Sequence, residues 1–322
     1  MSLRLLSLLL ALLVAGALVS LALPWPPIRD LLGRDQGLAA TIIVEIRLPR
    51  TLLALIYGGM LGASGAAIQA LFANPLASPD LTGTTSGAAL GAVVTAYLLG
   101  FSAPLALSAG AVGGAFAALL LLLALAGPRA ETATLLLAGL AISALAGALT
   151  TLALALSPSP FAFYDAYEWL MGSLVDRSLA QATFAAVPAI VSAALLLRLA
   201  GPLDSLTLGE EVAQSLGHDV RRLRLETICL TAVGVGACVA VCGAVGFIGL
   251  VAPVFARRLG GGHPGRAIGP ACVIGALLLL GADMVSRIAP VGRVLPLGVI
   301  TALLGAPFFL WLVAHMRWRL SR

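Results

Sequence analysis

The sequence predicts an all-α polytopic membrane protein with about ten transmembrane helices. Of its 322 residues, 60% are hydrophobic and only 10% are charged, whereas a soluble domain carries about 25% charged residues. The shortage of charge extends along the whole chain, so we expect a single transmembrane domain over residues 1–322. Because one span takes about 20 mostly apolar residues, this length accommodates about ten spans and short loops.

Ten apolar runs divide the chain, and turn-forming residues separate them. Asn74-Pro75, Gly127-Pro128 and the glycines at 260–262 are typical of breaks between helices. The first run is longer than the apolar core of a secretory signal peptide, so we expect an uncleaved first span even though residues 20–22 resemble a cleavage site. The predicted spans lie near residues 3–23, 48–71, 86–100, 104–126, 133–156, 181–199, 227–245, 247–258, 268–287 and 296–315.

Arginine supplies every basic side chain of the protein, with nineteen arginines and no lysine. A Walker-type phosphate loop needs a lysine on the nucleotide phosphates, and Schiff-base chemistry needs one too. Any ATP and magnesium must therefore be bound by a partner ATPase. The net charge of +5 does not indicate nucleic-acid binding, because the arginines stand mostly at the ends of apolar runs, as membrane topology requires.

An even number of spans places both termini on one side of the membrane. With that side cytoplasmic, twelve arginines lie inside and seven lie outside, in agreement with the positive-inside rule. The outside positions are 29, 34, 47, 50, 177, 287 and 293. The positive-inside rule predicts few arginines on the outer face, so the presence of these seven requires a functional explanation.

Cysteine and histidine give no sign of a metal centre or of a cofactor bound by this chain. The cysteines at 229, 238, 242 and 272 lie inside apolar runs, and no histidine or carboxylate flanks them with the spacing of a zinc site. We interpret them as small buried hydrophobic residues. The histidines at 218, 263 and 315 fall in or near inside segments, where we expect surface roles.

The longest predicted inside loop carries signals for two consecutive helices. Thr207 and Glu210 have the spacing of a capping box, which would begin a short helix over 208–216. Gly217 would end that helix in the left-handed conformation, and Asp219 would cap the helix that leads into the next span. A structureless linker needs no paired caps, so we expect a helical corner that docks a partner.

Short motifs follow one another along nearly the whole chain. Arg47-Leu48-Pro49-Arg50 opens the second span, and Gly246-Phe247-Ile248-Gly249-Leu250-Val251-Ala252-Pro253 opens the eighth. In this order the motifs resemble those of FecCD-type permeases, the membrane subunits of importers for iron–siderophores, haem and cobalamin. The remaining motifs are Gln69, Asn74-Pro75-Leu76-Ala77-Ser78-Pro79, Gly83, Ser86-Gly87-Ala88, Leu137-Ala138-Gly139, Trp169-Leu170-Met171-Gly172-Ser173-Leu174, Leu208-Gly209 with Ser215-Leu216-Gly217, Ala282-Asp283 with Arg287, Leu295-Pro296-Leu297-Gly298 and Gly305-Ala306-Pro307-Phe308.

The resemblance implies the fold of a type II ABC importer permease with ten spans in the bacterial inner membrane. It implies a second copy of the chain, two ATPase subunits inside and a substrate-binding protein in the periplasm, with lipid around the spans. The translocation path would follow the fifth and tenth spans, here near 133–156 and 296–315. The expected cargo is an iron chelate, either a ferric siderophore or haem, and the alternative is cobalamin or another metal chelate.

Two docking sites carry over from the family by position. Arg47, Arg50 and Arg287 would face the binding protein and pair with its carboxylates, which would explain three of the outside arginines. The corner at about 203–224 would dock in a groove of the ATPase. Its expected docking residues are Thr207, Gly209, Glu210, Glu211, Ser215, Leu216, Gly217, Asp219 and Arg221.

The chain departs from the family pattern at two positions. Val254 follows Pro253 where a histidine is usual, and Leu295 precedes Pro296 where a glutamate is usual. Neither departure falls within the two docking sites, and both set this chain apart from well-known members of the family.

Two other classes of membrane protein are weighed against the permease. Gly62-Ala63-Ser64-Gly65 matches the G-x-S-G pattern of an intramembrane serine protease, but that serine needs a histidine base, and only His315 stands near a span. An ion-coupled carrier keeps acidic residues near the middle of the bilayer, whereas Glu45, Glu226 and Asp283 lie at predicted span ends. We therefore favour a permease, which is not itself an enzyme.

Topology is tested by reporter fusions at Arg322 and within the 24–42 segment. A reporter that works only in the cytoplasm should be active at Arg322, and one that works only in the periplasm should be active within 24–42, because an even number of spans and the arginine distribution require this. Periplasmic activity at the C-terminus would contradict the predicted number of spans.

Overall fold

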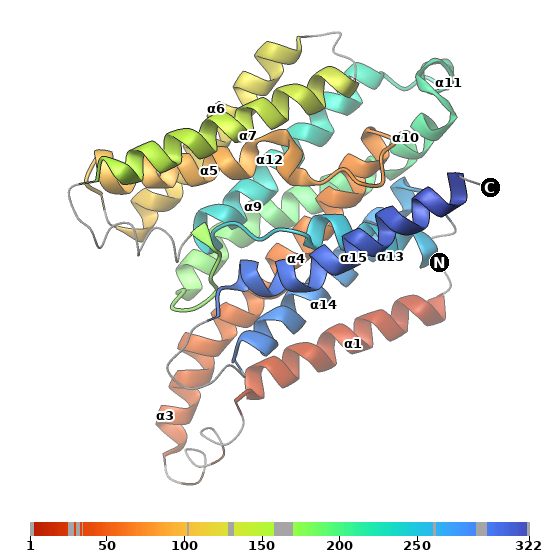
Figure 1. The fold of residues 1–322 in the computed structure, drawn as a ribbon. Coiled ribbons are helices and arrows are strands. Elements are labelled where there is room, and N and C mark those ends of the chain that lie inside the picture. Colours follow the sequence, from red (N-terminus) through yellow and green to blue (C-terminus); the bar gives the residue numbers. More distant parts are fainter. Residues whose placement is uncertain are drawn as a thin grey trace.

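Helices dominate the structure, as expected where backbone groups in a membrane must be hydrogen-bonded within the chain. This computed structural model describes residues 3–24, 29, 33, 35–101, 103–127, 132–157, 170–259, 262–287 and 295–320. Throughout these ranges the regular elements are helical, and none of the described residues lies in a strand. The long helices run side by side as a bundle (Figure 1), and the all-α prediction is confirmed.

The helices follow the predicted runs closely along the chain. They are α1 (Leu3–Ala22), α3 (Gln36–Thr41), the π-helical η1 (Ile42–Arg47), α4 (Leu48–Leu71), the 3-10 helix η2 (Pro79–Thr82), α5 (Thr84–Val93), the π-helical η3 (Val94–Leu98), α6 (Pro104–Ala126), α7 (Thr132–Ala155), α9 (Leu179–Arg198), α10 (Ala200–Ser205), the 3-10 helix η4 (Leu206–Leu208), α11 (Glu210–Ser215), α12 (Val220–Cys242), α13 (Ile248–Leu259), the 3-10 helix η5 (Gly265–Ala267), α14 (Ile268–Arg287) and α15 (Leu297–Leu320).

Six helical stretches of the described chain are long and apolar enough to cross a membrane. They are Gln36–Leu71, Leu105–Leu125, Thr134–Ala155, Leu179–Arg198, Val220–Cys242 and Gly265–Ser286. Three shorter apolar helices accompany them at Ser7–Ala22, Thr84–Leu98 and Leu297–Phe308. The short α13 has only 12 residues, so the count of about ten spans stays a prediction.

The second predicted span begins much earlier than the sequence indicated. Pro49 was expected to open the helix, but α3, η1 and α4 form one continuous helix of 36 residues from Gln36 to Leu71. Asp35 caps its first turn by accepting a hydrogen bond from the backbone N–H of Leu38 at 3.0 Å. The π-helical turn directly before Pro49 carries the helix past a residue that has no N–H. At 1.5 Å per residue the helix is about 54 Å long.

Helix α4 is the central element of the bundle and packs most extensively against α14. A Cβ atom on Gly62 would lie 1.9 Å from the carbonyl oxygen of Ala271 in α14, and a Cβ atom on Gly65 would lie 1.9 Å from that of Gly249 in α13. Only glycine permits such an approach. Small residues let helix backbones come close in lipid, where the hydrophobic effect does not drive association.

The first turn of α15 is held by backbone groups instead of a side-chain cap. The N–H groups of Leu297 and Gly298 donate to the carbonyl oxygens of Gly172 and Met171 at 3.0 and 2.9 Å. The N–H of Ser173 in turn donates to the last carbonyl of α12 at 2.8 Å. The segment 171–173 therefore bridges α12 and α15, and it satisfies donors that a helix start otherwise leaves free.

The link between α12 and α13 is not helical and is fixed by a buried tyrosine. The hydroxyl of Tyr57 donates to the carbonyl of Gly243 at 3.0 Å and accepts from the N–H of Val245 at 3.2 Å. The link ends at Phe247, whose φ of 66° lies in the left-handed region. That conformation costs a non-glycine residue roughly 1–2 kcal/mol, so the surrounding structure must impose it.

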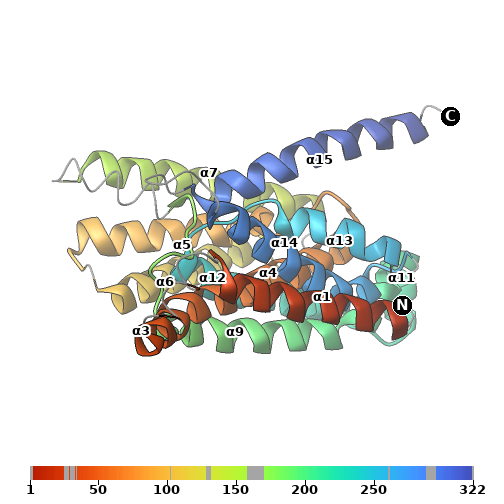
Figure 2. The same ribbon diagram turned by 90° about the horizontal axis from the view of Figure 1, so that it is seen from below.

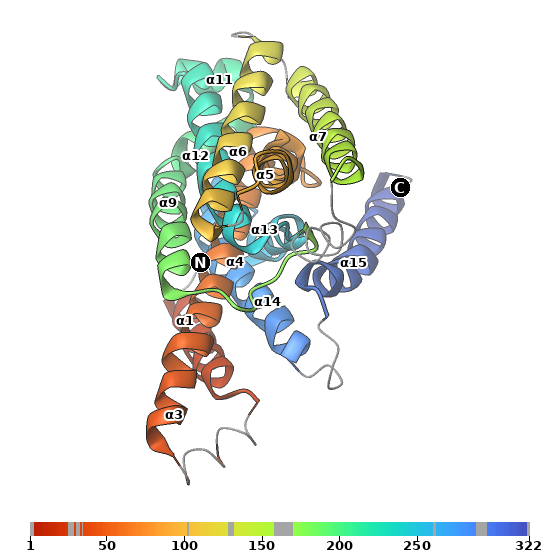
Figure 3. The same cartoon turned by 90° about the vertical axis from the view of Figure 1, so that its left-hand side faces the viewer.

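One side of the bundle carries α7 and α15, which lie at the edge of the molecule in two perpendicular views (Figures 2 and 3). Helix α15 packs against α13 and α14, and α7 packs against α5 and α6. Both helices leave large apolar side chains uncovered. These are Leu137, Leu140, Leu145, Leu149 and Leu152 on α7, Leu156 directly after it, and Leu303, Leu304 and Leu310 on α15.

The close approach of α4 to α14 is tested by Gly62→Ala. The added methyl group must push the two backbones apart, so we expect a loss of about 1–3 kcal/mol in the free energy of unfolding. Unfolding of the purified protein in mixed detergent measures this value. Gly113→Ala in α6 is the matched control, because nothing lies within 4 Å of a Cβ atom there. Equal stability of the two variants would contradict the packing described.

Candidate functional site

The end of the bundle that the sequence predicts to face outward (the outer end) holds a buried carboxylate between two arginines. Asp283, near the end of α14, is only 1% exposed. Its Oδ1 accepts a hydrogen bond from Nε of Arg50 in α4 at 2.7 Å, and its Oδ2 accepts one from Nε of Arg287 at 2.9 Å. Arg50 also donates from Nη2 to the hydroxyl of Ser286 at 2.9 Å. The cluster therefore fastens α4 to α14 where both helices approach the outer face.

Arg47 and Arg287 also donate hydrogen bonds to the C-terminal end of α1. Arg287 Nη1 donates to the carbonyl oxygen of Ser20 at 2.6 Å. Arg47 donates to the carbonyl oxygens of Leu21 and Pro24 at 2.9 and 3.2 Å. The last carbonyls of a helix lack partners within the helix and carry its negative partial charge, so guanidinium groups stabilise them. The arginines thereby fix the end of α1 against α4 and α14.

The expected exposure of the outside arginines is wrong for two of the three. Arg47 is 7% exposed, and the side chain of Arg287 is 5% exposed, whereas that of Arg50 is 18% exposed. Both side chains are buried because their N–H groups donate hydrogen bonds within the protein. Those of Arg287 go to Asp283 and to α1, and those of Arg47 go to carbonyl oxygens at the end of α1. The four-residue spacing of Asp283 and Arg287 could have been recognised as an ion pair, but the contact with Arg50 crosses 233 positions of sequence.

The other outside arginines are described only in part. Arg177 is half-buried, with its Nε buried and without a hydrogen bond. Arg34 and Arg293, like Trp169 of the quoted motif, lie outside the described residues. Arg47, Arg50, Arg287 and Asp283 together give the outer end of the bundle a net charge of +2.

At the cytoplasmic corner the predicted capping box is wrong. Thr207 lies in η4 and donates its hydroxyl to the carbonyl of Asp204 at 2.7 Å. Gly209, with a φ of 102°, stands at the N-cap of α11, so the helix begins two residues later than predicted. Glu210 is then the first helical residue, and its carboxylate pairs with Arg224 of α12 at 2.8 Å. The positive φ of Gly209 ends the 3-10 turn and displaces the cap.

The second half of the corner has the predicted local structure. Gly217 has a φ of 89°. Its N–H donates to the carbonyl of Gln214 at 2.9 Å, and the N–H of His218 donates to that of Ala213 at 3.1 Å, which is the Schellman pattern of helix termination. Asp219 then caps α12 by accepting from the N–H at position 222 at 3.0 Å. Both predicted helix signals are confirmed, whereas the docking role stays a prediction.

A row of apolar side chains is exposed on the corner. Leu208, Val212 and Leu216 are 64%, 42% and 59% exposed, while Ala213 on the opposite side is buried. The spacing of four residues places Val212 and Leu216 on one face of α11 and its C-terminal end, and Leu208 precedes this helix at the end of η4. The sequence prediction included Leu216 but missed the other two, although that spacing was the signal. The expected docking residues Glu211, Ser215 and Arg221 are also exposed.

Polar contacts tie the corner to the inner ends of several helices. Asp204 in α10 accepts a hydrogen bond from the N–H of Gly265 in η5 at 2.7 Å. Nearby, Gln69 at the end of α4 accepts from Nη2 of Arg257 in α13 at 2.7 Å and donates to the carbonyl of Leu250 at 3.3 Å. The corner is therefore hydrogen-bonded to the segment that leads into α14, and α4 is hydrogen-bonded to α13.

The residues of the protease alternative do not form a catalytic arrangement. Ser64 is fully buried and donates its hydroxyl to the carbonyl of Leu61 at 3.1 Å. His218 follows α11, and His263 lies in the turn between α13 and η5. Among the described residues, no three histidine, cysteine or acidic side chains gather as metal ligands would. Asp80, an acid in η2, accepts from the hydroxyl of Thr85 at 2.9 Å.

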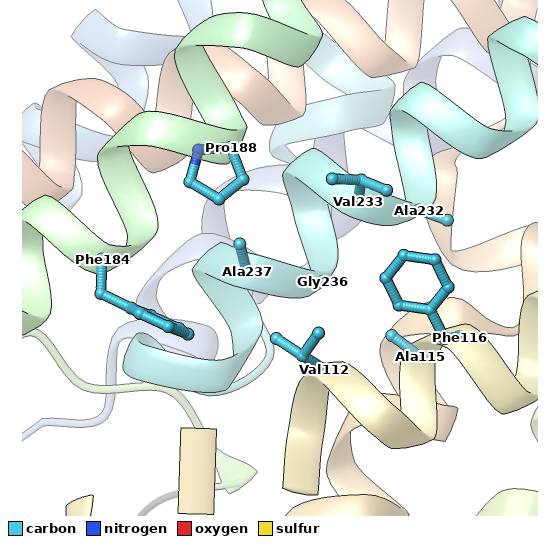
Figure 4. A pocket seen from close by; sticks show the side chains of 9 residues that line it. All are labelled: Val112, Ala115, Phe116, Phe184, Pro188, Ala232, Val233, Gly236 and Ala237. Carbon is cyan, nitrogen blue, oxygen red and sulfur yellow. The ribbon is translucent and has the colours of Figure 1, made fainter. Parts of the chain in front are cut away.

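Two hollows in the described bundle are lined by apolar side chains. One of about 100 Å³ lies between α6, α9 and α12, with the rings of Phe116 and Phe184 at its sides and Pro188 above it (Figure 4). The other, of about 320 Å³, lies between α5, α6 and α7. Neither offers hydrogen-bonding side chains that could orient a polar substrate, so we place the functional surfaces at the ends of the bundle and on the α7 and α15 side.

Comparison with known proteins decides the family. Residues 3–315 match the FecCD transport family. The chain belongs to this family. FecCD relatives with similar sequences are import permeases from several bacteria, and each aligns over more than four fifths of both chains.

Three of these relatives have different named cargoes. The Fe(3+)-citrate import permease YfmE of Bacillus subtilis is 34% identical over 89% of this chain and 85% of its own. The vitamin B12 import permease BtuC of Vibrio cholerae is 39% identical over 87% and 85%. The hemin transport permease HmuU of Yersinia pestis is 38% identical over 86% and 84%.

The fold agrees with this membership in the FecCD family. A solved transporter, described as an inward-facing metal-chelate type ABC transporter, superposes with a TM-score of 0.88 at 31% identity over 97% of this chain and 99% of its own. PsaBC of Streptococcus pneumoniae shares the fold alone, with a TM-score of 0.56 at 18% identity. This chain is therefore a multi-pass permease subunit of an ABC importer family, and permeases of this kind are not themselves enzymes.

The buried cluster at the outer end is tested by Asp283→Asn. Removing the carboxylate leaves two guanidinium groups without their counter-charge, so we expect the free energy of unfolding to fall by about 3–5 kcal/mol. The control is Glu226→Gln, which breaks the exposed pair with Arg222 on α12 and should change stability by only about 0.3–0.5 kcal/mol. Similar effects of the two substitutions would contradict the structural role of Asp283.

Proposed function

We propose that this chain is the permease subunit of an ATP-driven importer that moves an iron chelate, a ferric siderophore or haem, from periplasm to cytoplasm. The observation that carries the proposal is the capped cytoplasmic corner with its exposed row Leu208, Val212 and Leu216. Exposed apolar side chains on a rigid support mark protein-binding surfaces. A chain without lysine depends on such a partner for ATP and magnesium, and it binds no cofactor itself.

The proposed assembly contains two copies of the permease and two ATPase subunits in the bacterial inner membrane. Each copy spans the membrane ten times, with both termini in the cytoplasm. The uncovered leucines of α7 and α15 support a dimer, because large apolar patches on one face are typical of interfaces. The cargo then passes between the two copies, along these two helices, with lipid around the remaining spans.

On the outer face we propose docking of a periplasmic substrate-binding protein through Arg50. Of the three predicted arginines it has the most exposed side chain, at 18%. Arg47 and Arg287 add positive charge from below the surface and hold the end of α1. Exposed charges of this kind mainly raise the rate of encounter and fix the orientation of the partner.

The cargo is assigned by chemistry and by relatives. Among the similar permeases are those named for Fe(3+)-citrate and hemin, which supports an iron chelate. The relatives named for vitamin B12 support cobalamin as the second candidate. Uptake of labelled ferric siderophore, haemin and cobalamin by vesicles containing the permease, its ATPase and its binding protein distinguishes them. Uptake of none of these metal chelates would contradict the proposal.

ATPase docking is tested by Gly217→Val on co-expressed complexes. A β-branched residue is strained at a φ of 89°, so the end of α11 should shift and the docking surface with it. We expect at least a tenfold loss of ATPase that co-purifies with the permease, measured at equal permease expression. Asn tolerates this conformation better, so Gly217→Asn should retain most of the ATPase.

A second variant tests the exposed apolar row of the corner without changing the backbone at Gly217. Val212→Asp places a charge in the exposed row without changing the glycine, and it should also reduce ATPase retention. Normal retention by both Gly217→Val and Val212→Asp would mean that the corner is only a solvated loop and that the ATPase binds elsewhere.

A further inference from the structure

Phe247 combines a strained backbone with a side chain directed at another helix. Its φ of 66° is one that residues with side chains rarely adopt. Strain of this kind persists only where the surroundings impose it, and it often marks a functional position. Tyr57 holds the preceding link at Gly243 and Val245, and the carbonyl of Phe247 accepts from the N–H groups of Leu250 and Val251 in α13.

The ring of Phe247 meets α15 at Gly305. A Cβ atom on Gly305 would lie 2.3 Å from Cβ and 2.5 Å from Cγ of Phe247. Because Cβ keeps its position when the rotamer changes, a change of rotamer cannot remove the collision. The absent side chain of Gly305 therefore forms a notch that Phe247 fills.

The notch lies at the weakest point of α15. Pro307, two residues further on, has no N–H and leaves the carbonyl four residues before it without its helical partner. The carbonyl concerned belongs to Leu303, whose side chain is exposed. A helix bends most readily at such a position, so a contact at Gly305 controls the direction of the inner half of α15.

Other contacts hold the first half of α15. Its first turn is hydrogen-bonded to Met171 and Gly172, and the side chains of Leu297, Ile300 and Thr301 are buried. Further along, Phe308 stacks on Phe255 of α13 with ring centroids 5.1 Å apart. The side chains of Leu303, Leu304 and Leu310 are exposed, so the contact at Gly305 lies where the helix changes from a buried to a more exposed part.

We propose that Phe247 is a positioning residue for transport, which sets the direction of α15 along the cargo path by filling the notch at Gly305. Tyr57 orients the link that carries Phe247, and the link transmits the position of α12 and α13 to α15. Movement of α13 relative to α12 would then change the direction of α15 through the contact of Phe247 with Gly305. The transport role rests on the proposed function, whereas the positioning of α15 does not.

The experiment compares Gly305→Ala, Phe247→Gly and the double variant in vesicles with ATPase and binding protein. The methyl group of Gly305→Ala collides with Phe247, so we expect about a tenfold fall in cargo imported per ATP hydrolysed. Phe247→Gly removes the ring together with Cβ, the atom nearest to that methyl group, and should cause about a threefold fall. The double variant has no collision and should match Phe247→Gly, because residues in contact are not additive. Phe247→Tyr keeps the ring and should transport normally.

Cross-linking reports the position of α15 without transport. Phe255→Cys and Phe308→Cys, in a background with the four native cysteines changed to alanine, are joined by a short bifunctional thiol reagent. We expect Gly305→Ala to lower the cross-linking yield at least threefold and the double variant to give the yield of Phe247→Gly.

Gly281→Ala in α14 is the matched control, since nothing lies within 4 Å of a Cβ atom there. Normal cross-linking in Gly305→Ala, or a double variant with the product of both single effects, would overturn the inference while the proposed function stands. Absence of transport by the unchanged protein would instead contradict the proposed function, and the cross-linking yields would still decide the role of Phe247.

Discussion

The close approach of α4 to its neighbours is the constraint on which the rest of the structure depends. In lipid, apolar helices gain little by leaving one apolar environment for another, so shape complementarity and small residues must hold them together. Gly62 and Gly65 let α4 touch the backbones of α14 and α13. Once these three helices are fixed, their ends come close enough for polar side chains to reach across, and both candidate surfaces are built on those ends.

Polar contacts then secure each end of the bundle in a different way. At the outer end Asp283 pairs with Arg50 and Arg287, and Arg287 and Arg47 donate to the last carbonyls of α1. At the inner end Gln69, Asp204 and Arg257 link α4, α10 and α13 with the segment before α14. A buried carboxylate is tolerated in the first case because its charge is matched and its oxygens are hydrogen-bonded. Docking at either end would therefore act on elements already joined to the central helices.

The side of the bundle formed by α7 and α15 is packed less closely than the centre. These helices are supported from one side only, and their exposed leucines leave the opposite side for another apolar surface. A backbone link with a strained Phe247 meets α15 at Gly305. The bundle thus combines a closely packed centre with a loosely attached side, which is what a molecule needs if part of it is to move while its frame stays intact.

The sequence by itself determined the helical class, the approximate position of each apolar run, the left-handed Gly217 and the cap at Asp219, because these depend on local composition and on backbone preferences of single residues. The family followed from the order of the motifs. Tertiary structure decided what lies far apart in sequence: the contact of Arg50 with Asp283, the burial of Arg47 and the notch at Gly305. It also overruled two local signals, at Pro49 and at Thr207, since a π-helical turn and the positive φ of Gly209 moved the helix starts.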